Sequence, residues 1–188
     1  MTKRNAYLLV LALGATVVLT GCMPKMTIEE LKAMIPERPA ELDKLNAFAG
    51  TWEWDGETTV AGLDQVLKTT GSSEATWDGD GWYLVSREVG HIEELGDMQG
   101  LEAWTYDTHT KKYRGTWVDN MGSSGTGEAW HDEKTNTWHF RATSHGPCGK
   151  TSIKGHAKVL DENTMEWTFA EYAGLIKTME MTGTGRRR

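Results

Sequence analysis

The stretch GLEAWTYDTHTKKYRGTWVDNMGSSGTGEAW, residues 100–130, decides the fold class. Short polar turns divide it into three segments in which side chains alternate with a period of two: 101–107, 113–119 and 127–131. Such alternation between tight turns is typical of an antiparallel meander. We therefore expect three consecutive strands, with Glu102, Trp104 and Tyr106 on one face of the first.

The same pattern continues on both sides of this stretch. Gly50-Thr51-Trp52 is expected to open the first strand, and a helix leading into Gly-x-Trp resembles the start of lipocalin-like chains. Further alternating segments are 66–77, 81–89, 137–144, 152–160, 164–172 and 175–184. About ten short strands without an intervening helix predict an all-β antiparallel fold, a sandwich or a closed barrel. Because closure removes exposed strand edges, we favour a closed barrel. The resemblance to lipocalin-like chains implies that this barrel is of the lipocalin-like, calycin type.

Two short helices are predicted before the first strand. In the segment 26–34, Thr27 and Glu30 have the spacing of a capping box, which satisfies two backbone N–H groups at a helix start. A second helical segment follows Pro39 and places three apolar side chains on one face: Leu42, Leu45 and Phe48. We expect this segment to cap one mouth of the barrel, and a helix that binds a partner is the alternative.

The N-terminal residues have the pattern of an export signal. Lys3 and Arg4 precede the apolar run 6–18, which is short for a membrane-spanning helix. The sequence Leu19-Thr20-Gly21-Cys22 then resembles the lipobox of bacterial lipoproteins. This resemblance implies cleavage before Cys22 and attachment of lipid to that cysteine, which would hold the protein on a membrane. A plain secretory leader is the alternative.

These features predict a domain plan and a location. We expect a signal peptide at 1–21, a linker at 22–41, a barrel at 42–185 and a solvated basic tail at 186–188. Met23 after the lipidated cysteine resembles an outer-membrane address, so we expect an envelope protein facing the periplasm. Cys148 then remains a lone thiol in a Gly- and Pro-containing turn.

The charge of the chain limits its partners. With a net charge of -7 and no basic stripe before the final arginines, the protein is not expected to bind nucleic acid. Nine tryptophans in one domain indicate a deep aromatic core, a lined cavity, or both. Protein partners cannot be predicted from this composition.

The central strands resemble a known bacterial family. Tyr106-Asp107, then Lys112-Tyr113, then Trp117-Val118-Asp119-Asn120-Met121-Gly122 are similar to motifs of the DUF1579 family, although Asn120 replaces a usual small residue. The resemblance covers 42–185. It implies a lipocalin-like fold, and because the family is uncharacterised it implies no activity.

No catalytic or metal constellation is visible in the sequence. Serine has no nucleophile-elbow context, the histidines have no zinc-binding spacing, and no two carboxylates are placed together by the pattern. We therefore predict no enzyme, no metal and no cofactor. A haem-binding, nitrobindin-like barrel is a further alternative, with His156 as the candidate iron ligand, but Lys154 and Lys158 indicate that its face is solvated.

The remaining hypothesis is a ligand inside the barrel. Small barrels hold one small molecule, and an aromatic and methionine lining suits an apolar or amphipathic one. The candidate lining residues are Trp52, Trp54, Trp104, Tyr106, Tyr113, Trp117, Asp119, Trp138, Phe140, Trp167, Met179 and Met181, with Phe169 on the same face as Trp167. For Asp119, capping of the following turn is the alternative. A filled core serving protein interactions is the alternative for the whole domain.

Overall fold

The computed structural model describes residues 26–147 and 149–188. The chain divides into two compact units, one ending at Glu37 and the other comprising Arg38–Arg188, and each is considered by itself. The predicted signal peptide, the lipidation site Cys22 and the lone thiol Cys148 lie outside the described residues.

The first unit contains the predicted short helix, α1 (Ile28–Ala33). Its capping box is present: the Thr27 hydroxyl accepts the Glu30 N–H at 3.1 Å, and the Glu30 carboxylate accepts the Thr27 N–H at 2.7 Å. No α1 residue is buried within its unit. None of the helices in the described chain combines the length and the apolar character required to cross a bilayer.

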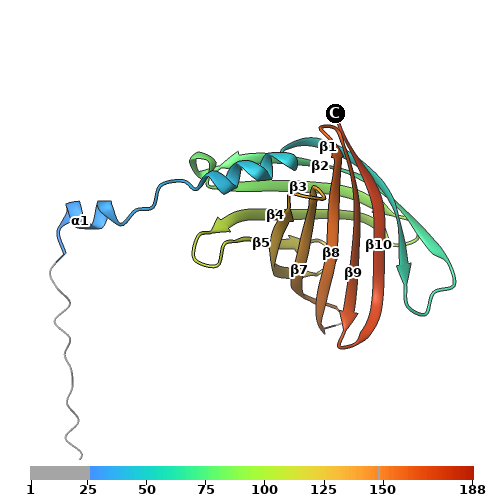
Figure 1. The fold of residues 1–188 in the computed structure, drawn as a ribbon. Helices are drawn as coiled ribbons and strands as arrows, with labels where there is room; N and C mark the ends of the chain where they lie inside the picture. Colours follow the sequence, from blue (N-terminus) through green and yellow to red (C-terminus); the bar gives the residue numbers. More distant parts are fainter. Residues whose placement is uncertain (1–25, 148) are drawn as a thin grey trace, which may run out of the picture. The chain divides into compact units, whose positions relative to one another are not determined.

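The second unit is a closed antiparallel barrel of ten strands (Figure 1). The strands are β1 (Gly50–Val60), β2 (Val66–Asp78), β3 (Tyr83–Ile92), β4 (Gly96–Asp107), β5 (Lys112–Asp119), β6 (Ser124–Asp132), β7 (Thr137–Gly146), β8 (Gly149–Asp161), β9 (Thr164–Ala173) and β10 (Ile176–Arg187). Each strand pairs with its neighbours in sequence, and β1 pairs with β10 to close the sheet. The prediction of an all-β barrel of about ten strands is confirmed.

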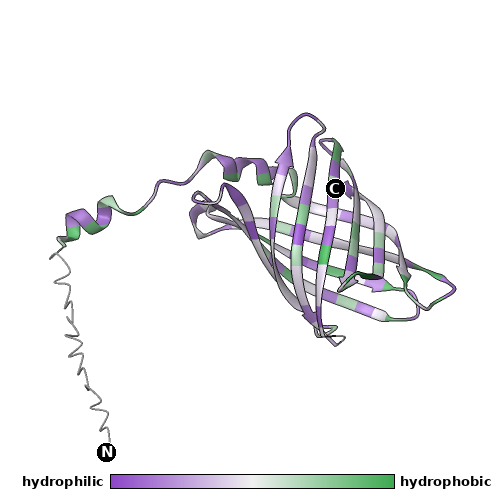
Figure 2. Ribbon diagram, turned by 60° about the horizontal axis from the view of Figure 1, so that its bottom comes forward, coloured by the Kyte–Doolittle hydropathy of each residue, from purple (hydrophilic) through white to green (hydrophobic). Residues whose placement is uncertain are grey.

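The alternation of side chains separates the interior of the barrel from its outer surface. Hydrophilic and hydrophobic bands succeed one another along the strands in Figure 2. On β1, Trp52 and Thr58 are buried, whereas Thr51 and Glu53, on either side of Trp52, are exposed. The period of two therefore gives each strand one apolar inner face, as the sequence predicts.

The 3-10 helix η1 (Ala40–Ala47) covers one end of the barrel. Leu42 and Leu45 are almost completely buried and join the core around Trp138. The Tyr113 hydroxyl donates a 2.8 Å hydrogen bond to the carbonyl of Glu41, which ties η1 to β5. The predicted apolar face of this segment is confirmed, and it faces the core of its own barrel.

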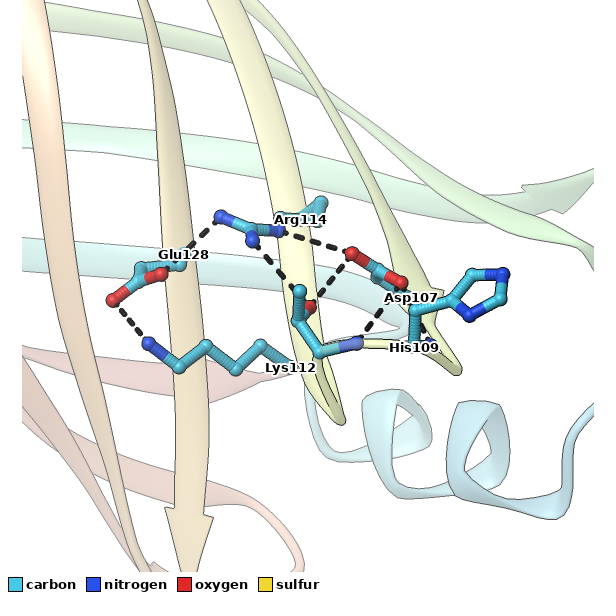
Figure 3. A network of polar contacts seen from close by, with 6 residues as sticks. Asp107, His109, Lys112, Arg114 and Glu128 are labelled. Carbon is cyan, nitrogen blue, oxygen red and sulfur yellow. Dashed lines mark hydrogen bonds and ion pairs between the residues drawn. The ribbon is translucent and has the colours of Figure 1, made fainter.

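A polar network fixes the β4–β5 hairpin next to η1 (Figure 3). Asp107 accepts N–H bonds from His109 and Thr110 and a 2.6 Å bond from the Thr110 hydroxyl, so it stabilises the turn. These bonds lower the pKa of Asp107 to about 2. Glu128 on β6 binds both Lys112 and Arg114, at 2.6 and 3.2 Å. The Tyr-Asp and Lys-Tyr motifs of the sequence therefore flank a structural turn.

Inside the barrel, large side chains lie directly over glycines of adjacent strands. The cross-strand pairs are Trp54 with Gly71, Trp104 with Gly115, Trp117 with Gly125, Trp167 with Gly183, and Phe169 with Gly155. A Cβ added to any of these glycines would come within 2.2–2.5 Å of a ring carbon. The absent side chains thus let the rings lie against the barrel wall.

Three sequence-based boundaries differ from the structure. Residues 186–188 do not form a solvated tail, because β10 continues to Arg187, whose guanidinium lies 4.7 Å from the Trp52 ring centre and donates to the carbonyl of Ala47. The strand predicted at 101–107 begins at Gly96, since pairing with β3 orders five further residues of weak strand propensity. The linker boundary expected at 41 and 42 falls inside η1.

The glycine pairs predict a specific cost of added volume. In Gly115→Ala the new Cβ would lie 2.5 Å from the Trp104 ring, so the indole must move away from the wall. We expect the free energy of unfolding to fall by about 1–3 kcal/mol, as for other overpacked cores. Denaturant unfolding followed by tryptophan fluorescence measures this loss.

Gly100→Ala is the matched control on the neighbouring strand. Its added Cβ would have no neighbour closer than 3.8 Å, and Gly100 has no positive φ. We expect stability to be unchanged or raised by up to about 1 kcal/mol. Equal losses in Gly115→Ala and Gly100→Ala would contradict the role assigned to the ring–glycine contact.

Candidate functional site

The barrel encloses a cavity of about 400 Å³ that is partly open to solvent. This volume lies within the range of roughly 300–1,000 Å³ found for small-molecule pockets. Its lining begins at Leu45 and Phe48, next to η1. It extends to Met98 on β4 and Asp119 on β5, at the other end of the barrel. The interior is therefore a lined cavity and not a completely filled core.

Most of the predicted lining residues do meet at this cavity. Those that line it are Trp52, Trp54, Trp104, Trp117, Asp119, Trp138, Phe140, Trp167 and Met181, together with Phe169. They come from six different strands, β1, β4, β5, β7, β9 and β10. Period-two alternation, applied strand by strand, was sufficient to bring these side chains to one site.

Three predicted residues lie away from the cavity. Tyr113 packs edge-on against Trp138 at 4.8 Å, on the side of η1, and Tyr106 packs on Tyr113 at 5.0 Å. Burial raises the pKa of Tyr113 to about 12, and its hydroxyl is used by η1. Met179 follows a register shift at residues 177–179 and is absent from the lining. These residues share the inner face but lie beyond the two ends of the cavity.

Asp119 fulfils both of the roles considered for it. One of its carboxylate oxygens accepts N–H bonds from Met121 and Ser123, each at 2.9 Å, so it caps the turn before β6. The same residue lines the cavity. Its hydrogen-bonding capacity is thus committed mainly to the backbone.

Two further acids, Glu88 on β3 and Glu102 on β4, line the same cavity. The sequence pattern places no two carboxylates together, whereas the structure brings these two to one cavity. Burial, followed by repulsion from Glu88, raises the pKa of Glu102 to about 8, although a hydrogen bond from the Trp104 indole N–H opposes the shift. Burial likewise raises the pKa of Glu88. The wall of an otherwise aromatic cavity therefore holds a pair of poorly solvated carboxyl groups.

The sequence contains the signal for these two residues. Glu102 is two residues before Trp104 and therefore shares its inner face. Glu88 is four residues after the buried Leu84 and shares that face in the same way. These two residues are missed because charged side chains are normally assigned to the solvent-exposed face of a strand. The register that makes them neighbours, Glu88 opposite Gly100 and Glu102 opposite Ser86, requires the structure.

Histidine and metal chemistry have little support in the described residues. His156 is exposed and lies on the outer face of β8, between the exposed Lys154 and Lys158. Its imidazole therefore cannot reach a ligand inside the barrel. Within 26–147 and 149–188, no three His, Cys, Asp or Glu residues come together as a potential metal site.

The fold and the cavity define a class of protein: small calycin-like barrels with an internal site. The chain belongs to a family described as "Protein of unknown function (DUF1579)", whose model matches residues 38–185. The family resemblance noted in the sequence is thereby confirmed. No curated protein matches the chain.

Two solved structures share this fold. The S-type phycobiliprotein lyase CPES from Guillardia theta has a TM-score of 0.57 at 9% identity, covering 87% of this chain and 98% of the lyase. Rv2717c from M. tuberculosis has a TM-score of 0.63 at 8% identity, covering 81% of this chain and 99% of that protein. At such identities the similarity establishes the fold alone, so the site must be interpreted from its own residues.

The raised pKa of Glu102 predicts a pH-dependent stability. Between the unfolded value of 4.5 and the folded value of about 8, the folded state binds more protons, so stability falls as pH rises through this window. Glu102→Gln keeps the acceptor for Trp104 and removes the charge. We expect it to raise the free energy of unfolding at pH 9 by roughly 2 kcal/mol or more, since each pKa unit corresponds to about 1.4 kcal/mol.

The same variant should have almost no effect at pH 4, where the carboxyl is protonated in both states. Glu74→Gln, at an exposed position of β2, is the control and should leave the pH profile unchanged. Denaturant unfolding at pH 4, 7 and 9 makes the comparison. A destabilisation of Glu102→Gln that is equal at all three values would contradict a buried, poorly solvated carboxyl.

Proposed function

We propose that this protein binds one small hydrophobic or amphipathic molecule inside its barrel while attached to the bacterial envelope through lipid on Cys22. The cavity of about 400 Å³ carries the binding proposal, because a filled-core interaction module would have no such space. The lipobox-like sequence before Cys22 supports the attachment. The location that follows is the periplasmic face of the outer membrane.

The shape of the site supports binding of an apolar body. Indole and phenyl rings from several strands surround the space, and their pairing with glycines keeps them at the wall. Aromatic surfaces of this kind bury apolar ligand area at about 25 cal/mol per Å². No step of catalysis is proposed.

The binding proposal predicts a ligand that is retained or taken up. The unit Arg38–Arg188 closes its own sheet and core, so a soluble protein starting at Met23 keeps the site. Native mass spectrometry after purification from a bacterial periplasm should show a bound small molecule that is released on denaturation. If the site is empty, uptake is tested with fatty acids, quinones and haem.

A cavity-filling variant makes this test specific. Ala142 lines the cavity, so the larger side chain of Ala142→Phe would take up part of the space and should lower binding at least tenfold. Thr126→Phe places the same ring on the exposed face of β6 and should bind normally. A clean unliganded mass with no uptake by any form would refute the binding proposal and favour the interaction module.

The anchoring proposal is tested separately in the full chain. In a Gram-negative host, we expect the protein to fractionate with the outer membrane and to carry an acylated N-terminus in mass spectra. Cys22→Ser should abolish lipid attachment, whereas Cys148→Ser should leave it intact. An unacylated, soluble periplasmic protein in all three cases would indicate a plain secretory leader.

A further inference from the structure

Glu88 and Glu102 form a defined pair on the inner wall of the barrel. Glu88 lies opposite Gly100, and Glu102 is two residues further along β4, so the two are diagonal neighbours across one antiparallel ladder. Such neighbours have Cα atoms roughly 7–8 Å apart, and long side chains bridge that distance. Both line the cavity.

The two carboxyl groups differ in how well they are satisfied. Glu102 accepts a hydrogen bond from the Trp104 indole. Glu88 is half-buried at the cavity wall, and in the part of the chain that the structure describes no side-chain hydrogen bond or ion pair reaches its carboxylate. Gly100 leaves it uncovered, since even an added Cβ there would remain 3.9 Å from Oε2 of Glu88.

No cation of the described protein compensates these acids inside the cavity. The other charged residues at the lining are Asp119 and Arg141. The Asp119 carboxylate caps its turn. Arg141 is exposed, and its guanidinium lies 5.2 Å from the ring centre of Trp130, on the face opposite Phe140 and Ala142. Arg187 packs on Trp52 near η1 and is not part of the lining, so the charged groups that face the cavity are all acidic.

Aromatic rings surround the acidic pair. Trp117 lies directly opposite Glu102 on β5, and Trp104 lies two residues away on the same strand. On the other side, the Trp54 ring lies over Gly90, two residues from Glu88. Indole faces attract cations, most strongly where water is excluded. Carboxylates and ring faces together make a site for a positive charge attached to an apolar body.

The energetics favour one ligand charge over the others. Burying carboxyl groups without a partner is costly, and a ligand cation would offset that cost. An anionic ligand would lose its own solvation and find no cation among the groups that face the cavity. A neutral ligand would fill the apolar space and leave the acids unpaired.

From this arrangement we infer that the cavity selects hydrophobic amines: molecules with an apolar body and one ammonium group held between Glu88 and Glu102. This inference rests on the proposed function, because it specifies the ligand of the same cavity.

Three probes of equal chain length test it: decylamine, decanol and decanoate. Binding to the soluble protein starting at Met23 is followed at pH 7 by tryptophan fluorescence. We expect decylamine to bind at least tenfold more tightly than decanol, and decanoate to bind more weakly than decanol. Within the variant Glu88→Gln/Glu102→Gln, decylamine should bind no more tightly than decanol, and Glu74→Gln should keep the preference of the wild type.

Proton release provides a second measurement on the unmodified protein. An ammonium next to the pair lowers the affinity of both carboxyl groups for protons, and Asp119 is the remaining acid at this lining. Titration calorimetry at pH 7 in two buffers of different ionisation enthalpy should therefore show protons released with decylamine and none with decanol.

The outcomes separate the two proposals. Equal or weaker binding of decylamine relative to decanol would overturn the amine inference and leave the binding function intact. An unchanged preference for decylamine over decanol in the double glutamine variant would also contradict it, because the acids would then not select the charge. Failure of all three probes, with an unliganded native mass, would refute both proposals.

Discussion

The contact between an indole ring and a glycine on the next strand is the constraint on which this barrel depends. Because each such glycine has no Cβ, the ring opposite it lies flat against the backbone and leaves the centre of the barrel free. The same rings pointing inward would fill the interior. The protein thus has a tryptophan-rich core and a cavity at once, which are usually alternatives in small β-barrels.

The acidic pair acquires its properties from this arrangement. Glu88 and Glu102 lie at the wall of a largely apolar cavity, and its lining supplies one indole N–H and no inward-facing cation to them. A structural role would be better served by an apolar pair, since buried charges without partners reduce stability. The amine selectivity proposed above would give this costly pair a role in recognition.

Much of the fold could be predicted from the sequence, because the interior and the exterior of a barrel impose a period of two. That period identified the ten strands and brought Trp54, Trp104 and Trp167 to one face. It does not contain the cross-strand register, so the pairing of rings with glycines and the proximity of Glu88 to Glu102 were not predicted. Arg187 was misassigned because arginine usually lies in solvent. Here its guanidinium lies over the Trp52 ring and donates hydrogen bonds to two backbone carbonyls.

Closure of the sheet by β1 and β10 has a consequence for biogenesis. Trp52 pairs with Arg187, so the first strand waits for a partner that follows all the others along the chain. Until β10 arrives, the sheet has two open edges and its aromatic interior is unprotected. A polypeptide exported from its N-terminus would therefore cross the membrane as an unclosed chain and complete its barrel only on the far side. Late closure of this kind would keep an exported chain open until its last strand has crossed.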